Sequence, residues 1–123
     1  MLNSSKLLID ESPLQFQPSL ACAIGVNEAI FLQQLHYWLK RSNHFIEGRY
    51  WIYKTVKEWN EDTFPFWSNA TTKRVITSLR NQKVLIVSRF NRAGFDKTNW
   101  YSIDYDSLNQ LVSHPLGQIG TMD

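Results

Sequence analysis

The chain has 123 residues, of which 43% are hydrophobic, so it is long enough to bury one core and its composition is that of a globular domain. A formal net charge of +2 excludes a uniformly cationic nucleic-acid coat protein, and the single cysteine excludes an intrachain disulfide. No apolar run reaches the roughly 18 residues of a membrane span, and the N-terminus lacks the apolar region of a signal peptide. We therefore expect a cytoplasmic protein with no membrane partner.

The N-terminal segment is predicted to lead into a short helix. Residues 1–13 are polar and expected to be flexible, and the alternation in residues 14–16 predicts an edge strand. Pro18 can open a helical turn that runs to Gly25. Cys22 lies in an apolar run, which favours a buried and unreactive thiol.

A longer helix is predicted next. Asn27 is its expected N-cap, Glu28 lies in its first turn, and the helix is predicted to end near Arg41. The residues at helical spacing on its expected buried face are Ile30, Phe31, Leu35, Trp38 and Leu39. Residues 42–48 are polar and are predicted to be a connector.

The centre of the chain reads as a strand, a short helix and a turn. Residues 49–54 are aromatic and β-branched, which predicts a strand. Thr55 and Glu58 form a capping box, which predicts a helix over residues 55–61. Because Pro65 disfavours helical geometry in the residue before it, residues 64–67 are predicted to form an aromatic turn.

A second helix follows the turn, so this region is predicted to be a helix-turn-helix. Ser68 is its expected N-cap, and the helix is predicted to run over residues 69–82. One face is apolar and is assigned to the core: Thr72, Val75, Ile76 and Leu79. The opposite face is polar or small and is flanked by Thr71 and Lys73: Ala70, Arg74, Thr77, Ser78 and Asn81.

The C-terminal part is predicted to be a hairpin, a helix and a tail. Residues 84–90 and 98–104 read as strands, and residues 91–97 form the glycine-containing loop of a wing. Residues 105–112 are predicted to be a last short helix, and residues 113–123 a tail or linker. The predicted fold class is mostly α with a small β-sheet (α+β), a winged helix-turn-helix over residues 14–112 with an N-terminal extension.

Positive charge gathers on the second helix and the wing. Seven basic residues and one acid lie between Lys73 and Lys97, a net of +6, so the rest of the chain carries −4. A duplex offers lines of phosphates and a major groove that admits one helix, so a small-sided helix flanked by cations suits it. A basic face is also common as a solvated surface, but the order of elements favours DNA. The predicted DNA contacts are Ser68, Asn69, Thr71, Lys73, Arg74, Thr77, Arg89, Arg92 and Lys97.

Nothing in the sequence indicates catalysis. His36, His44 and His114 lie in three different contexts, and no His or Cys pair has the spacing of metal ligands. The acidic residues Glu58, Glu61 and Asp62 are better explained as a solvated helix face than as an acid/base pair. We expect no enzyme activity, no catalytic residue, no metal and no cofactor.

Four stretches resemble a known family: AIGVNEAIFLQQLHYWL, GRYWIYKTVKEW, FPFWSNATTKRVITSL and DKTNWYSIDY. Together they resemble the N-terminal winged-helix domain of replication proteins from phages and prophages of Gram-positive bacteria, of the DnaD-like replisome organiser type. A looser likeness is to plasmid replication initiators. The resemblance covers about residues 14–108 and supports residues 68–74 as the start of the recognition helix and residues 92–97 as the wing tip.

The resemblance implies a non-catalytic role in DNA replication initiation. It implies binding to an origin or to single-stranded or duplex DNA, with duplex DNA as the first expectation. It also implies self-association into a homo-oligomer and contacts with replisome proteins such as a helicase loader. It also implies a C-terminal domain after this region, so a piece of a longer chain and a short separate protein are both open. An oligomerisation module, with Phe16, Tyr37 and Trp38 exposed, and a transcriptional regulator of the same fold are the alternatives.

Overall fold

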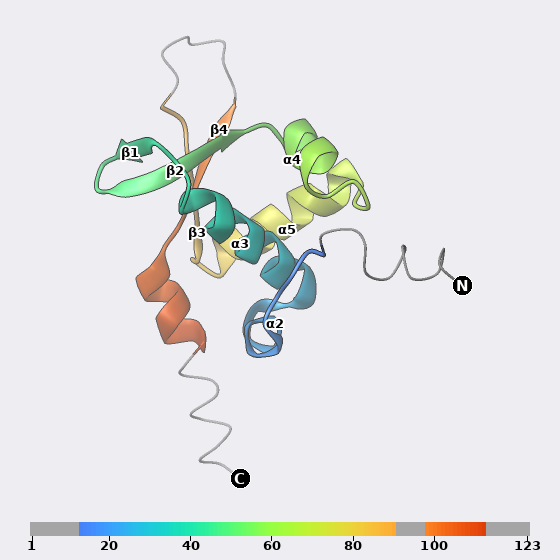
Figure 1. The fold of residues 1–123 in the computed structure, drawn as a ribbon. Helices are drawn as coiled ribbons and strands as arrows, with labels where there is room; N and C mark the ends of the chain where they lie inside the picture. The colour runs from blue at the N-terminus through green and yellow to red at the C-terminus, as the bar shows by residue number, and fades with distance from the viewer. Residues whose placement is uncertain (1–12, 91–97, 113–123) are drawn as a thin grey trace.

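The computed structural model describes residues 13–90 and 98–112 and confirms the α+β class (Figure 1). Within these residues a last helix, 105–112, follows the labelled elements. In chain order those elements are α2 (Pro18–Ile24), α3 (Val26–Leu39), β1 (His44–Ile46), β2 (Arg49–Lys54), α4 (Val56–Asp62), α5 (Asn69–Asn81), β3 (Leu85–Ser88) and β4 (Asn99–Ile103). No helix in this described part combines the length and apolar character needed to cross a bilayer.

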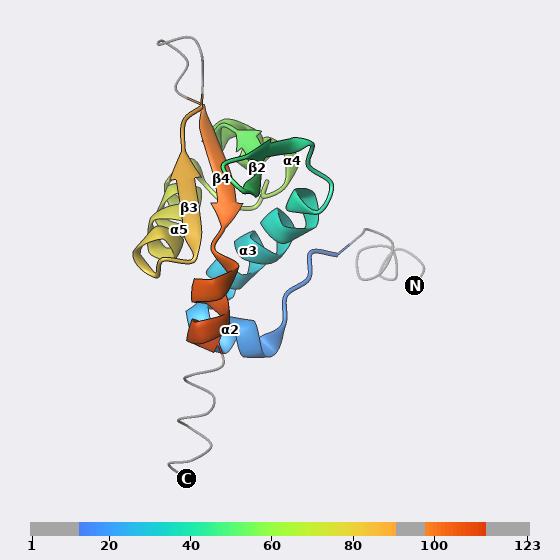
Figure 2. The same cartoon turned by 90° about the vertical axis from the view of Figure 1, so that its left-hand side faces the viewer.

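The four strands form one antiparallel sheet in the order β1-β2-β4-β3. Tyr101 of β4 pairs with Ile52 of β2 on one side and with Val87 of β3 on the other, so these three side chains share a face. That face contacts α3 and α5, which lie behind the strands in Figure 2. The core therefore lies between the helices and one side of the sheet.

Aromatic rings fill the centre of this core. The Phe31 ring of α3 lies 4.9 Å from the ring of Trp59, 5.4 Å from that of Phe64 and 6.4 Å from that of Tyr101. All four side chains are fully buried, and they come from α3, α4, the turn after α4 and β4. The turn predicted at residues 64–67 therefore has a structural role. The ring of its first residue, Phe64, packs in the core and holds α4 and α5 against the sheet.

Several local predictions are confirmed. The capping box of α4 is present, with Thr55 Oγ1 accepting the Glu58 N–H and Glu58 accepting the Thr55 N–H. Ser68 caps α5, and the predicted apolar face of α5 is buried. Helix 105–112 forms as predicted. The predicted termini 1–12 and 113–123 and the wing loop 91–97 lie outside the described residues.

Two predictions about the N-terminal segment are wrong. Residues 14–16 form no strand, because Leu14 packs against the core as the chain runs irregularly into α2. Cys22 is exposed, since the helical period turns Leu20, Ala21, Ala23 and Ile24 toward the core and leaves Cys22 on the other side of α2.

Two predictions about α3 also need correction. Gly25, not Asn27, is the N-cap, and its φ of 109° lets one residue end α2 and start α3. A Cβ at Gly25 would lie 2.3 Å from Glu28 Oε1. Trp38 is 38% exposed, because the buried stripe of α3 runs through Phe31, Leu35 and Leu39 and leaves position 38 beside it.

The connector predicted at residues 42–48 contains a strand that the sequence analysis missed. β1 pairs with β2 through a tight turn in which Glu47 (φ 52°) and Gly48 (φ 81°) are both left-handed. Such two-residue turns match the twist of a hairpin. The sequence indicated this turn only weakly, because glutamate rarely adopts a positive φ.

Candidate nucleic-acid interface

The exposed side of α5 is the surface on which the predicted contacts meet. Thr72, Val75, Ile76 and Leu79 are buried against the core, and this fixes the rotation of the helix. The opposite side is therefore solvent-facing, and its exposed residues are Ala70, Lys73, Arg74, Thr77 and Asn81. Ser78 departs from the prediction, because it is half-buried and its Oγ lies 3.2 Å from Gln82 Nε2.

The first turn of α5 is ordered by its cap. Ser68 Oγ accepts the Thr71 N–H at 3.1 Å and lies 3.1 Å from Thr71 Oγ1, to which it donates. The Ser68 hydroxyl proton is thus used within the cap, whereas the Thr71 hydroxyl accepts and keeps its own proton for an outside acceptor. This geometry suits Thr71 better than Ser68 as a donor to a phosphate oxygen.

Asn60 of α4 holds the start of α5 in place, and the sequence analysis did not single it out. Its Nδ2 donates to Asn69 Oδ1 at 2.6 Å and to the Trp67 carbonyl at 3.3 Å, and its Oδ1 accepts from the Thr72 hydroxyl. Asn69 is consequently fixed through its oxygen, and its side-chain N–H groups donate to no described residue. The only sequence signal for this role is that asparagine, a poor helix former, stands near the end of a short predicted helix.

The charge on this side of α5 is positive, and no acid in the described part of the chain pairs with it. Lys73 and Arg74 have no ion-pair partner among the described residues, and the first turn of α5 holds no acid. The neighbouring acids of α4 are engaged: Lys54 Nζ lies 2.9 Å from Asp62, Lys57 Nζ lies 3.9 Å from Glu61, and Glu58 serves its capping box. Within the described residues, both cations therefore face solvent without an ion pair.

The predicted wing is described only at its base. Arg89, just after β3, is exposed, and its Nε donates to Asn99 Oδ1 of β4 at 3.1 Å. No acceptor among the described residues bonds the two terminal nitrogens of its guanidinium. Arg92 and Lys97 lie outside the described residues.

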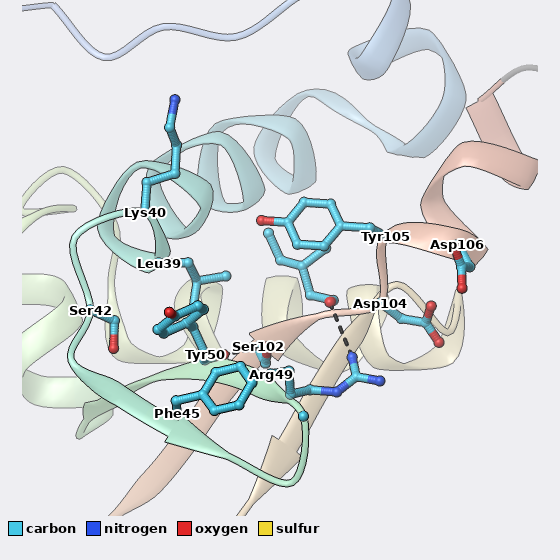
Figure 3. Close-up of a pocket in the computed structure, with 12 residues that line it drawn as sticks. Leu39, Lys40, Ser42, Phe45, Arg49, Tyr50, Ser102, Asp104, Tyr105 and Asp106 are labelled. Carbon is cyan, nitrogen blue, oxygen red and sulfur yellow. Dashed lines mark hydrogen bonds between the residues drawn. The ribbon is translucent and has the colours of Figure 1, made fainter.

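A pocket of about 610 Å³ lies between the C-terminal end of α3, the β1-β2 hairpin and residues 104–106 (Figure 3). Phe45, Tyr50 and Tyr105 line it, and Arg49 Nη1 donates to the Ile103 carbonyl at 3.3 Å at its edge. None of the residues predicted to contact DNA lines this pocket.

Comparisons of the chain with family models, curated proteins and solved structures returned no match. Within the described ranges, no group of three or more His, Cys, Asp and Glu side chains is placed to hold a metal ion. We therefore infer a function from the geometry of α5 and its surroundings.

Proposed function

We propose that residues 14–112 form a winged helix-turn-helix domain that binds duplex DNA through α5 in phage-type replication initiation. The observation that carries this proposal is the solvent-facing side of α5, where Lys73, Arg74 and Thr77 are exposed and both cations lack an ion-pair partner in the described part of the chain. The domain would position DNA and perform no chemical step.

The element order supports a winged helix. From α3 onward the chain runs helix, strand, two helices joined by a tight turn, and two antiparallel strands, with β1 as an addition at the sheet edge. In helix-turn-helix proteins the second helix of the pair enters the major groove. In this chain that helix is α5, whose buried side fixes which residues would enter.

The chemistry of the exposed side fits the parts of a duplex. Ala70 and Thr77 are small enough to let the helix approach the base edges, and Arg74 between them can donate two hydrogen bonds to a guanine. Lys73, at the flank, is suited to a phosphate, as are the Thr71 hydroxyl and the Asn69 amide at the helix start. The replication role is taken from the family resemblance alone.

The double substitution Lys73→Ala and Arg74→Ala tests the proposal. Both side chains are exposed, so we expect the fold to be kept and duplex affinity to fall about tenfold or more. The slope of log affinity against log salt should drop by about one, because Lys73 is the one of the two assigned to a phosphate. Gel-shift and fluorescence-anisotropy titrations over a range of salt concentrations measure both quantities.

Lys40→Ala with Arg41→Ala is the matched control, because it removes an adjacent exposed Lys-Arg pair at the end of α3 with the same change in net charge. We expect this control to lower duplex affinity only slightly. Equal losses in the two double variants would show non-specific attraction, and no loss in the α5 variant would refute the assignment.

A second candidate function, an oligomerisation module, is favoured by exposed aromatic residues near the N-terminus and on α3. Phe16 is 40% exposed, Tyr37 43% and Trp38 38%. Light scattering combined with DNA titration separates the two functions, because stable oligomers without DNA affinity support the second. A transcriptional regulator would use the same α5 surface, and a selected binding site with its genomic position distinguishes it from the first.

A further inference from the structure

The pocket of Figure 3 lies at the end of α3, on the side of the sheet that faces the core. Tyr50 shares this side with Ile52 and Tyr101, because alternate residues of a strand point the same way and paired residues share a face. Leu39, the last residue of α3, lines the pocket together with Ile103, and both side chains are buried. The floor of the pocket therefore belongs to the hydrophobic core.

Three exposed aromatic side chains form the walls of the pocket. Strand β1 places Phe45 opposite Tyr50 of β2, with the two ring centroids 4.8 Å apart, and Tyr105 at the start of the last helix adds a third ring (Figure 3). Phe45 is 59% exposed, Tyr50 49% and Tyr105 41%. Large apolar side chains that gather on a surface mark a binding site, whereas single exposed ones do not. The pocket volume of about 610 Å³ also lies within the range of ligand sites, roughly 300–1,000 Å³.

Several polar groups of the lining are already used within the fold. The hydroxyl groups of Ser42 and Ser102 each donate to a backbone carbonyl of β2, and the Tyr105 hydroxyl is hydrogen-bonded to a side chain of α3. Asp104 Oδ1 accepts the Ser107 N–H at 3.0 Å and so caps the last helix. These groups hold the pocket in shape, and their hydrogen bonds need no ligand.

Arg49 is the exception among the polar residues of the pocket. Its side chain is half-buried, and its Nη1 donates to the Ile103 carbonyl at 3.3 Å. Within the described ranges it makes no other hydrogen bond and no ion pair. A guanidinium has five N–H donors in a planar fork that matches a carboxylate. This half-buried cation therefore has one neutral acceptor and lacks an anionic partner.

The charges and the exposure of the lining favour a peptide over a nucleic acid or a small molecule. Four charged residues line the pocket, two of each sign: Lys40, Arg49, Asp104 and Asp106. The two carboxylates repel a strand that carries a phosphate at every nucleotide. Sites for small molecules enclose about 70–90% of their ligand, whereas the walls of this pocket are 41–59% exposed. A peptide needs only one side chain in the hollow and one carboxylate at Arg49.

We propose that the pocket binds an acidic segment of a partner protein, with an aromatic side chain seated against Phe45 and Tyr50 and the carboxylate of an adjacent residue paired with Arg49. An aromatic anchor that fills a pocket commonly supplies much of the energy of such an interface, and a bidentate arginine-carboxylate pair fixes its orientation. None of the residues predicted to contact DNA lines the pocket, so the inference goes beyond duplex binding and does not depend on it.

The test uses a fluorescently labelled peptide in which one aspartate-phenylalanine pair is flanked by glycine and serine. We expect saturable binding with a Kd of about 1 mM or tighter in an anisotropy titration. In an NMR titration the largest shifts of backbone N–H resonances should fall at Leu39, Tyr50 and Ile103. Replacing the phenylalanine of the peptide by alanine should weaken binding about tenfold or more, because the anchor is lost.

Phe45→Ala in the protein should weaken peptide binding severalfold, because it removes one wall of the pocket. Phe66→Ala is the matched control, since Phe66 is also 59% exposed but lies in the turn before α5 and does not line the pocket. We expect this control to leave peptide binding unchanged. Circular dichroism of each variant confirms that the fold is kept.

Arg49→Gln tests the charge pair, because glutamine keeps an N–H for the Ile103 carbonyl and removes the positive charge. A peptide with asparagine in place of aspartate should bind the unaltered protein severalfold more weakly than the original peptide does. The Arg49→Gln variant should bind the two peptides equally. The Lys73→Ala and Arg74→Ala variant should keep peptide binding while it loses duplex affinity, and Phe45→Ala should keep duplex affinity.

Four outcomes would overturn the inference. The first is that the unaltered protein shows no saturable binding of the peptide, and the second is that Phe45→Ala binds it no more weakly than Phe66→Ala. The third is that free phenylacetate displaces the peptide at equal concentration, which would assign the pocket to a small carboxylic acid. The fourth is that Phe45→Ala changes the oligomeric state and not peptide affinity, which would assign the pocket to contacts between copies of the chain. Each outcome leaves the result for duplex binding by α5 to be judged separately.

Discussion

At the scale of single residues, the side chain of Asn60 holds the start of α5 in place. One amide joins three partners on two elements: the Trp67 carbonyl of the turn, and the side chains of Asn69 and Thr72 on α5. Thr72 is fully buried, so its hydroxyl would lack a partner without Asn60. The contact therefore stabilises the fold and sets the direction of the first turn of α5 at the same time.

The substitution Asn60→Ala should lower the free energy of unfolding by about 1–3 kcal/mol, because it leaves the buried Thr72 hydroxyl unsatisfied. Chemical denaturation followed by circular dichroism measures this. Asn81→Ala is the matched control, since Asn81 is exposed at the last position of α5, and its effect should stay within about 0.5 kcal/mol. Equal effects of the two variants would contradict the role given to Asn60.

At the scale of elements, the start of α5 has an uncharged N-cap and no acidic side chain beside the positive end of its helix dipole. Ser68 accepts the Thr71 N–H, and the first turn contains no acid. The positive end of the helix is thus free of internal carboxylates, unlike α4, whose first turn holds Glu58. This difference favours α5 as the helix that meets a phosphate.

The substitution Ser68→Asp distinguishes the capping role of residue 68 from a contact between the start of α5 and a phosphate. Aspartate is as good an N-cap as serine, so stability should be kept, whereas Ser68→Ala should cost about 1 kcal/mol. The added negative charge should nevertheless weaken duplex binding severalfold in an anisotropy titration. Thr55→Asp places the same charge at the N-cap of α4 and should have a smaller effect, and identical effects at the two caps would contradict a phosphate at α5.

At the scale of the whole molecule, the last helix is attached to α3. His36 Nδ1 lies 2.8 Å from the Tyr105 hydroxyl, and the two rings meet edge to face at 5.7 Å. Burial of the ring, and then the charge of Lys40, lower the pKa of His36 below its ordinary 6.5. The C-terminal helix is thus fixed to the body of the fold through a histidine whose pKa is lowered by burial.

The sign of the pH effect follows from that lowered pKa. Between the lowered value and 6.5 the unfolded chain binds more protons than the folded one, so His36 destabilises the fold as the pH falls through this window and has no effect above it. Denaturation midpoints at about pH 7.5 and pH 5 should differ less in His36→Gln than in the unaltered protein. The titrating carboxylates are the same in both proteins, so their contributions cancel when the two pH differences are compared. An equal difference in both would contradict this account.

The elements with strong local signals were predictable. The Thr55-Glu58 box and the Ser68 cap act through neighbouring backbone groups, and the apolar period of α5 fixes its buried side, so residues 68–77 could be assigned from spacing alone. The missed features depend on partners distant in sequence or on rare backbone angles. Strand β1 needs β2 beside it and a left-handed Glu47, and Trp38 is exposed because of where α3 meets the sheet.

The sequence by itself determined where helices begin, which side of α5 is apolar, and that positive charge gathers after Lys73, because these depend on residues within a few positions of one another. Only the tertiary structure decided that Asn60 reaches Asn69 and Thr72, and that Tyr53, Trp100 and His44 share one face. Such contacts follow from helix packing and strand register. These are set by the burial of the whole core, which no local pattern contains.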